Sequence, residues 1–289
     1  MSANTERSQS AHKNTQRTIR YIVLVLLSII CIFPFYVLII NSTHPSADIA
    51  KGLLLIPGTY FGKNFSNTLN DASIPILRAM LNSVIIATLT AGLTTYFSCI
   101  TAYSIHVYDF AGKKAVHTFI LAVMMIPAQV SALGFYDLMK SFKLLNNYIP
   151  LIVPAVASPV VYFFMLQYMQ SSLPLEIVEA ARIDGSTEFK TFNSIVLPIM
   201  KPAIAVQAIF AFVSSWNNYF TPNLIIESKH TELYTLPIVI AKLRASDFIS
   251  FDNGKIYMAI FLSIVPVIVV YLILSKNIIQ GVAVGAVKG

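Results

Sequence analysis

The amino-acid sequence predicts an all-α integral membrane protein with six transmembrane helices. Of its 289 residues, 56% are hydrophobic and only 11% are charged, whereas soluble domains carry about a quarter charged residues. The mean hydropathy is +0.70. Six stretches have or approach the roughly 20 apolar residues that a helix needs to cross a hydrocarbon core about 30 Å thick. These features favour a membrane domain over one large soluble core.

The apolar runs define the predicted spans. We place them at residues 20–40, 80–104, 116–138, 148–169, 203–222 and 256–275. The first run follows a basic leader and stays apolar as far as Ile40, with no small-residue cleavage site after it, so we interpret it as a retained helix. The predicted organisation is a cytoplasmic leader over 1–20, a membrane domain over 21–275 and a cytoplasmic tail over 276–289.

The basic leader predicts the orientation of the chain. Lys13, Arg17 and Arg20 precede the first span, and basic residues that flank the first helix stay on the cytoplasmic side. With six spans, both termini are then cytoplasmic. The other basic residues divide almost evenly between the two sides, so the leader decides the orientation.

Polar side chains gather at the end of the fifth predicted span. At about 100° per residue, Gln207, Ser214 and Asn218 lie within roughly 20° of one direction on a helix. Amides and aromatic rings suit a polyhydroxylated ligand. The alternative is an aromatic interfacial belt with interhelical hydrogen bonds. The candidate substrate-path residues are Gln207, Ser214, Trp216, Asn217, Asn218 and Tyr219.

The sequence lacks the patterns of a catalytic, nucleotide-binding or metal-binding chain. It contains no GxxxxGK[ST] phosphate loop and no His, Cys, Asp and Glu set with metal-ligand spacing. Cys31 and Cys99 lie in apolar runs and are expected to be small buried hydrophobic residues. The sequence has no stripe of basic residues with interleaved aromatics, so nucleic-acid binding is not predicted. We therefore expect a chain without a cofactor or enzymatic activity of its own, whose energy source is another subunit.

A polar helix–turn–helix is predicted between the fourth and fifth spans, over residues 172–202. Pro174 suits the first turn of a helix. Gly185 follows that helix and suits a left-handed backbone. Ser186 or Thr187 can then cap a second helix.

The second helix of this segment is expected to carry Phe189, Phe192 and Val196 on one face and to end at Pro198. Acidic residues outnumber basic ones in the segment. An acidic surface is repelled by an anionic inner leaflet. Docking into a protein groove is therefore favoured over an amphipathic helix that lies on the membrane.

The same segment resembles the EAA loop of ABC importer permeases. That pattern is Glu-Ala-Ala, three residues, Gly, nine residues, then Ile-x-Leu-Pro. The matching residues are Glu179, Ala180, Ala181, Gly185, Ile195, Leu197 and Pro198. The resemblance implies that the loop is a coupling helix that docks into a cleft of an ATPase subunit. Together with Asp184, these are the candidate ATPase-coupling residues.

Three further stretches are similar to the shorter permease of maltose-type carbohydrate importers. They are WNNYFTPNLI (216–225), TLPIVIAK (235–242) and the C-terminal QGVAVGAVKG (280–289). In that family the C-terminal tail can reach the ATPase dimer, so the resemblance makes Gly285, Lys288 and Gly289 candidate ATPase contacts.

The resemblance implies a type I ABC importer permease with six transmembrane helices in the cell membrane of a prokaryote. Its expected partners are a homologous permease subunit, two ATPase subunits that bind ATP and Mg²⁺, an extracellular or periplasmic solute-binding protein, membrane lipid and a sugar, expected to be an oligosaccharide. The alternative is a secondary transporter of a small polar solute without an ATPase. The short six-helix chain and the absence of any pair of acidic residues within a span count against that alternative.

Overall fold

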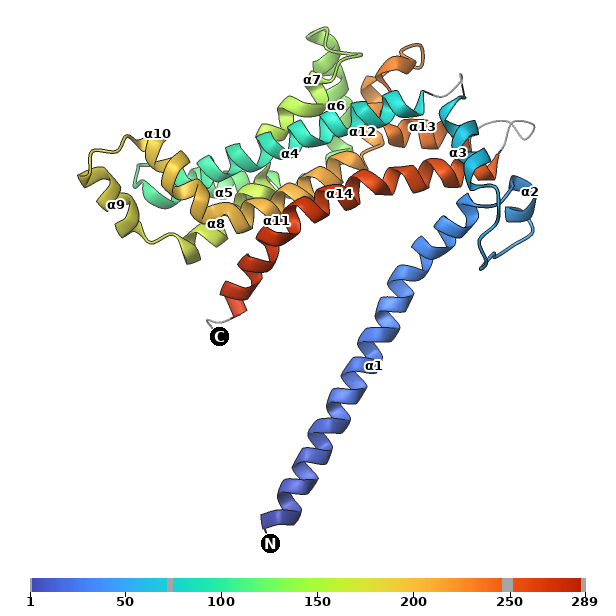
Figure 1. Cartoon of the computed structure of the whole chain (residues 1–289). Helices are drawn as coiled ribbons and strands as arrows, with labels where there is room; N and C mark the ends of the chain where they lie inside the picture. Colours follow the sequence, from blue (N-terminus) through green and yellow to red (C-terminus); the bar gives the residue numbers. More distant parts are fainter. Residues whose placement is uncertain (1, 72–74, 246–251, 287–289) are drawn as a thin grey trace. The chain divides into compact units, whose positions relative to one another are not determined.

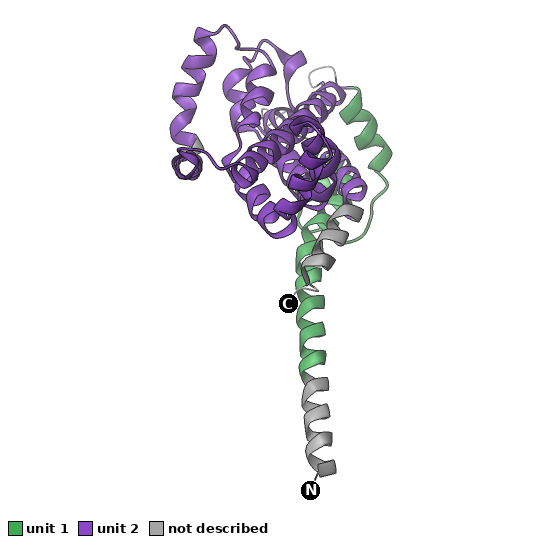
Figure 2. Ribbon diagram, turned by 90° about the vertical axis from the view of Figure 1, so that its left-hand side faces the viewer, with its two compact units in different colours: residues 1–70, 247–261 green, residues 71–246, 262–289 purple. Residues whose placement is uncertain are grey.

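The computed structural model describes residues 2–71, 75–245 and 252–286, and no strand occurs within these ranges (Figure 1). The predicted all-α class is confirmed. The chain divides into two compact units: residues 1–70 with 247–261, and residues 71–246 with 262–289 (Figure 2).

The first unit contains α1 (Ser2–Ser42), α2 (Ser46–Ile49), α3 (Phe61–Leu69) and the beginning of α14 (Asn253–Ala286). The last carbonyl groups of a helix have no partner within it. Asn64 of α3 donates from Nδ2 to the carbonyl oxygens of Ser42, at 2.9 Å, and His44, at 2.8 Å. This buried amide therefore ties α3 to the end of α1.

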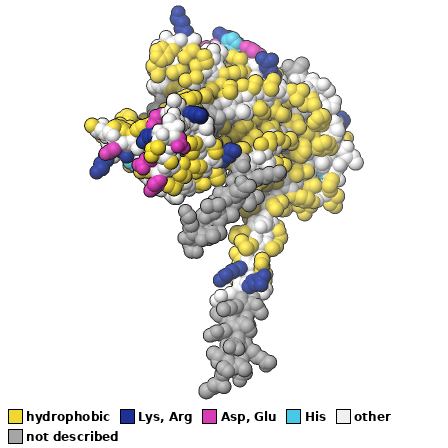
Figure 3. All heavy atoms as spheres, turned by 60° about the vertical axis from the view of Figure 1, so that its left-hand side comes forward, with side chains coloured by type: hydrophobic (Ala, Val, Ile, Leu, Met, Phe, Trp, Pro, Cys, Tyr) yellow, Lys and Arg dark blue, Asp and Glu magenta, His cyan; other side chains and the backbone are white. Residues whose placement is uncertain are grey.

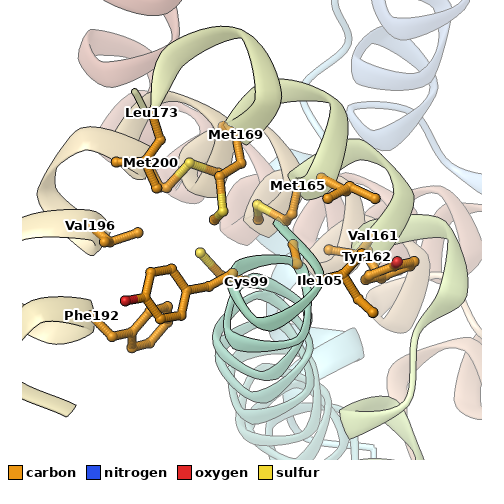
Figure 4. Close-up of a cluster of buried hydrophobic side chains, with 14 of the residues drawn as sticks. Cys99, Ile105, Val161, Tyr162, Met165, Met169, Leu173, Phe192, Val196 and Met200 are labelled. Carbon is orange, nitrogen blue, oxygen red and sulfur yellow. The ribbon is translucent and has the colours of Figure 1, made fainter. Parts of the chain in front are cut away.

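The core of the second unit is formed by α4 (Ile76–Val107), α8 (Pro159–Ser172) and α11 (Leu197–Trp216). Small residues of α4, among them Ala87, Ala91 and Ala102, are fully or almost fully buried, and small side chains allow helices in membranes to approach closely. Cys99 is completely buried and lies among methionine and aromatic side chains (Figure 4). The prediction of a buried cysteine is confirmed for Cys99 and wrong for Cys31, which is exposed on α1.

The helical stretch that ends in α8 is broken by prolines. It begins with α7 (Ile149–Ile152) and the 3-10 turn Val153–Val156, which we call the broken segment together with the two residues that follow, and it continues as α8. Proline has no N–H, so Pro159 leaves the carbonyl of Ala155, four residues earlier, without its helical donor. Hydroxyl groups spaced four residues apart on α4 bond to this segment. The three bonds are Thr90 Oγ1 to Leu151 O at 3.4 Å, Thr94 Oγ1 to Ala155 O at 2.9 Å and Ser98 Oγ to Ser158 O at 3.4 Å.

The third predicted span, 116–138, is two helices rather than one: α5 (Lys113–Val123) and α6 (Ala128–Ser141), of 11 and 14 residues. Pro127 stands between them in an extended backbone conformation, with φ −61° and ψ 128°. It cannot donate a helical hydrogen bond. Each helix alone is shorter than a hydrocarbon core about 30 Å thick.

Within the described ranges, five helical stretches are long and apolar enough to cross a membrane. They are Gln16–Ser42, Ile76–Val107, Ile149–Ser172, Glu188–Trp216 and Asn253–Ser275. The count of six spans stays a prediction, as does the division of the chain at residues 20 and 275. Both of those boundaries fall inside continuous helices, α1 and α14.

The fifth predicted span, 203–222, differs from the helix observed. The helical stretch begins at Glu188 and ends at Trp216. It is followed by α12 (Phe220–Ile225), the 3-10 turn Thr231–Leu233 and α13 (Leu236–Arg244).

We expect Thr94→Val to lower the free energy of unfolding by about 1 kcal/mol, because Val has the same shape but leaves the Ala155 carbonyl without a donor. The measurement is a denaturation titration of the purified protein in detergent. Thr101→Val is the matched control, since Thr101 bonds to a carbonyl of its own helix. Its effect should stay within about 0.5 kcal/mol. Equal losses in the two variants would contradict the role given to Thr94.

Candidate functional site

The predicted helix–turn–helix is present in the second unit. Its first helix, α9 (Leu175–Ile183), begins after Pro174. Gly185 has a φ of 76°, in the left-handed region. The amide of Ser186 donates to Ala181 O at 2.9 Å and the amide of Gly185 to Arg182 O at 3.0 Å. This pair of bonds is a Schellman motif, which satisfies carbonyl groups at the end of α9.

The second helix begins at α10 (Glu188–Thr191), where Thr187 Oγ1 accepts from the Lys190 amide at 3.4 Å. The chain continues through a π-helical turn, Phe192–Val196, directly into α11. The expectation that Pro198 ends this helix is therefore wrong. The wider π turn before Pro198 accommodates a ring that would clash with the i−4 carbonyl in a regular helix.

The expected apolar face of the second helix is only partly correct. Phe192 and Val196 are 1% and 0% exposed and belong to the core with α4 and α8, whereas Phe189 is 70% exposed. Phe189 lies one turn before the point at which the chain enters that core, so it has nothing to pack against.

Glu188 holds the two halves of the loop together. Arg182 Nε donates to Glu188 Oε1 at 2.6 Å, and the hydroxyls of Tyr103 and Tyr108 donate to Oε2 at 3.0 and 2.6 Å. The Arg182 guanidinium also lies 5.4 Å from the centre of the Tyr108 ring. Partial burial and the hydrogen bond to Glu188 raise the pKa of Tyr108, so its hydroxyl remains a donor at neutral pH.

This cluster of Arg182, Glu188, Tyr103 and Tyr108, which we call the Glu188 clamp, was not predicted. In the sequence, Glu188 counts as one more acidic residue of the loop. The only local signal is an opposite charge on each side of the turn. Because Tyr103 belongs to α4, the clamp joins the loop to the core.

The remaining coupling candidates are mostly exposed. Glu179, Ala180, Asp184, Gly185 and Pro198 are exposed, Ile195 and Leu197 are half-buried, and Ala181 is buried. Two apolar side chains stand out beside them, Ile183 at 87% and Phe189 at 70% exposed. Acidic side chains gather at the end of the molecule that carries α9 and α10 (Figure 3). The loop thus presents two apolar side chains among carboxylates.

The second unit also contains a cavity of about 680 Å³, which we call the membrane cavity. It is lined by residues of α4, α6, the broken segment, α11 and α12. Hydroxyl groups dominate its polar lining, and three phenyl rings, Phe135, Phe210 and Phe220, contribute much of its apolar surface. Its volume falls in the range of sites for small molecules.

Three of the six substrate-path candidates line the membrane cavity: Gln207, Ser214 and Asn218. Asn218 lies beyond the end of α11 rather than on it, and its Oδ1 accepts from the Thr221 amide at 3.2 Å. Among the lining residues that were not candidates, Thr235 was seen only as part of the similarity over 235–242. Its place in the same lining as Gln207 depends on the fold.

The other three candidates do not line this cavity. Trp216 is buried, stacks on Phe212 with ring centres 5.8 Å apart, and donates from Nε1 to Ser263 O at 3.2 Å. Asn217 and Tyr219 are exposed. In the structure Trp216 is therefore a packing residue between α11 and α14.

The tail candidates lie at the edge of the described residues. Gly285 is in the last turn of α14, and Lys288 and Gly289 lie outside the described residues. In the part of the chain that the structure covers, no three His, Cys, Asp or Glu residues are grouped so as to hold a metal ion.

Comparison with known proteins matches residues 95–283 to the family described as "Binding-protein-dependent transport system inner membrane component". The arabinooligosaccharides transport system permease protein AraQ of Bacillus subtilis (strain 168) is 33% identical over 271 residues, which cover 92% of this chain and 93% of that protein. The lactose transport system permease protein LacG of Rhizobium radiobacter is 28% identical over 270 residues, with 93% and 96% covered.

Among solved structures, a similar fold occurs in a bacterial ABC transporter involved in the import of the acidic polysaccharide alginate. The TM-score is 0.77 at 19% sequence identity, and the match covers 92% of this chain and 97% of that one. At this identity the match supports the fold.

We expect Glu188→Ala to loosen the loop, because the substitution removes three charge-assisted hydrogen bonds at a partly exposed site. A local loss of about 1 kcal/mol corresponds to roughly fivefold faster hydrogen exchange of the amides over 175–191. Exchange is measured by mass spectrometry on the purified protein.

The matched control is Glu179→Ala, which removes an exposed carboxylate of the same loop that has no hydrogen bond within the described part of the chain. Its exchange rates should match those of the unaltered protein. If both variants exchange alike, the Glu188 clamp does not hold the loop.

Proposed function

The chain belongs to the binding-protein-dependent transport system inner membrane component family, and we propose that it is one permease subunit of an ATP-driven sugar importer. The family is that of the membrane component, so this chain is not the enzyme of the system. ATP hydrolysis, with bound ATP and Mg²⁺, belongs to two partner ATPase subunits, and this chain binds no cofactor of its own.

The observation that carries this proposal is the exposed loop with the EAA spacing. The Schellman motif at Gly185 turns the chain sharply, and the Glu188 clamp joins the loop to α4. Ile183 and Phe189 are exposed on this supported loop, and exposed apolar side chains on such a loop suit a protein groove.

In the proposed complex each coupling residue has a distinct role. Glu179 pairs with a basic residue in the ATPase cleft, Ala180 lets the two surfaces approach closely, and Gly185 allows the turn. The docking segment is completed by Asp184, Ile195, Leu197 and Pro198. The tail reaches the ATPase dimer through Gly285, Lys288 and Gly289.

The other partners are a homologous permease subunit, with which this chain forms the translocation path, and an extracellular or periplasmic solute-binding protein. The chain spans the cell membrane of a prokaryote several times, and both of its termini lie on the cytoplasmic side. Closure of the ATPase dimer on ATP moves the coupling loops, and the permease pair then opens to the opposite side. A ligand drives such a switch only by binding one state better than the other.

The proposed substrate is a sugar, most simply an oligosaccharide. The membrane cavity supports this with hydroxyl and amide groups beside phenyl rings, since sugars need hydrogen-bond partners and flat apolar surfaces. The transport systems of AraQ and LacG are those for arabinooligosaccharides and lactose. Gln207, Ser214 and Asn218 are the proposed path residues. Asn217 and Tyr219 would extend the path at the end of α11.

The test is to purify the chain from its native membrane in mild detergent and to identify the proteins that accompany it by mass spectrometry. A second permease and an ATPase with a phosphate loop are the expected companions. A lone chain or a homo-oligomer, found reproducibly, would contradict the proposal and favour a secondary transporter that works without an ATPase.

We expect Gly185→Val to weaken retention of the ATPase about tenfold, because a left-handed backbone costs a β-branched residue about 1–2 kcal/mol or more. Gly185→Asn is the control, since asparagine tolerates this conformation. A side chain at this position meets no atom within 4 Å, so steric clash does not separate the two. Co-purification and uptake should fall only for the valine variant, and equal retention in both variants would rule out the turn as the cause.

A further inference from the structure

Two buried polar side chains of the membrane cavity have no hydrogen-bond partner in the described part of the chain. Gln207 on α11 is 7% exposed, and its amide makes no hydrogen bond there. Thr235 is 3% exposed and its Oγ1 is unpaired. Buried polar groups are nearly always hydrogen-bonded. The two residues therefore mark places where a ligand completes the bonding.

Thr235 is notable because it stands at the N-cap of α13. A threonine at this position commonly accepts a hydrogen bond from an amide of the first helical turn. Here the hydroxyl makes no such bond. The Leu236 amide, at the first helical position, donates to Ser83 Oγ at 2.8 Å. Thr235 is a lining residue of the cavity, and its buried hydroxyl is left without a partner in the described part of the chain.

The other buried polar side chains of the lining, Ser83 and Thr94, are already engaged, as is the amide oxygen of the half-buried Asn218. The Thr94 hydroxyl donates to Ala155 O, and Asn218 Oδ1 accepts from the Thr221 amide. Among the buried polar side chains of the lining, the free groups are thus an amide at Gln207, which offers two N–H donors and one acceptor, and a hydroxyl at Thr235. A sugar hydroxyl, which donates and accepts at once, complements both.

The lining of the membrane cavity carries no ionisable side chain. None of its residues, all of which lie in the described ranges, is Asp, Glu, Lys, Arg or His. Sites that recognise carboxylates and phosphates commonly use Arg or Lys. The N-terminus of α8 reaches the cavity, but it supplies at most about half a positive charge. Its first residue, Pro159, has no N–H to donate.

We propose that the membrane cavity admits uncharged, polyhydroxylated ligands and excludes anionic ones such as uronates and sugar phosphates, with Gln207 and Thr235 as direct ligand contacts. An anion that enters this cavity loses hydration and gains no opposite charge from its walls. A neutral sugar exchanges its water bonds for those of the lining. This inference rests on the proposed function as a sugar permease and specifies its substrate class.

The test uses the intact transporter, purified with its partner subunits and reconstituted in lipid nanodiscs without the solute-binding protein. Binding of arabinotriose, maltotriose and trigalacturonate is compared by saturation-transfer difference NMR, which detects weak binding. The three probes have the same number of sugar rings. We expect at least one neutral trisaccharide to bind with a dissociation constant at least tenfold lower than that of trigalacturonate.

Variants of this chain assign the effect to its own lining. Gln207→Leu and Thr235→Val keep the approximate shape of each side chain and should weaken binding of the neutral trisaccharide at least fivefold. Thr101→Val, whose hydroxyl bonds within α4 away from the cavity, is the control. Ser214→Lys, at an exposed lining position, should improve binding of trigalacturonate at least fivefold. Ser171→Lys, outside the lining, should not.

The outcomes separate this inference from the function on which it rests. Trigalacturonate binding as tight as that of the neutral probes would overturn charge exclusion and leave sugar import intact. Unchanged neutral binding in Gln207→Leu and Thr235→Val would overturn the assigned contacts. If no neutral trisaccharide binds to a transporter that retains all its subunits, both this inference and the proposed sugar substrate fail.

Discussion

The structure of the second unit depends on one requirement of the membrane: each backbone N–H and C=O must find a partner within the protein. The prolines at 154 and 159 break the helix before α8 and free backbone carbonyls. Thr94 of α4 supplies the donor that the Ala155 carbonyl lacks, and Thr90 and Ser98 add two longer bonds to the same segment. The irregular backbone that results forms part of the cavity wall.

The same helix reaches both functional regions. Thr94 in the middle of α4 bonds to the cavity wall, and Tyr103 near its end donates to Glu188 of the helix–turn–helix loop. Between them, small side chains keep α4 packed against α8 and α11. A rigid element that contacts two sites is a physical route by which movement of one can alter the other.

The two regions use charge in opposite ways. The loop carries several carboxylates. Glu188 is bound by Arg182 and the two tyrosines, whereas Glu179 and Asp184 are exposed. The cavity has no ionisable lining at all. A charged side chain keeps its hydration on the exposed loop. In the lining of the membrane cavity, among apolar helices, it would lose hydration without gaining an opposite charge.

The sequence by itself determined the helical class, most of the apolar spans and the turn at Gly185, because apolar length and a left-handed glycine act locally. It also predicted that Gln207, Ser214 and Asn218 share a surface. Only the tertiary structure decided that Phe189 is exposed, that Trp216 bonds to α14, and that the Thr235 hydroxyl has no partner in the described part of the chain. Each of these depends on which elements pack against one another in the folded chain, and the spacing of residues along one helix does not specify those neighbours.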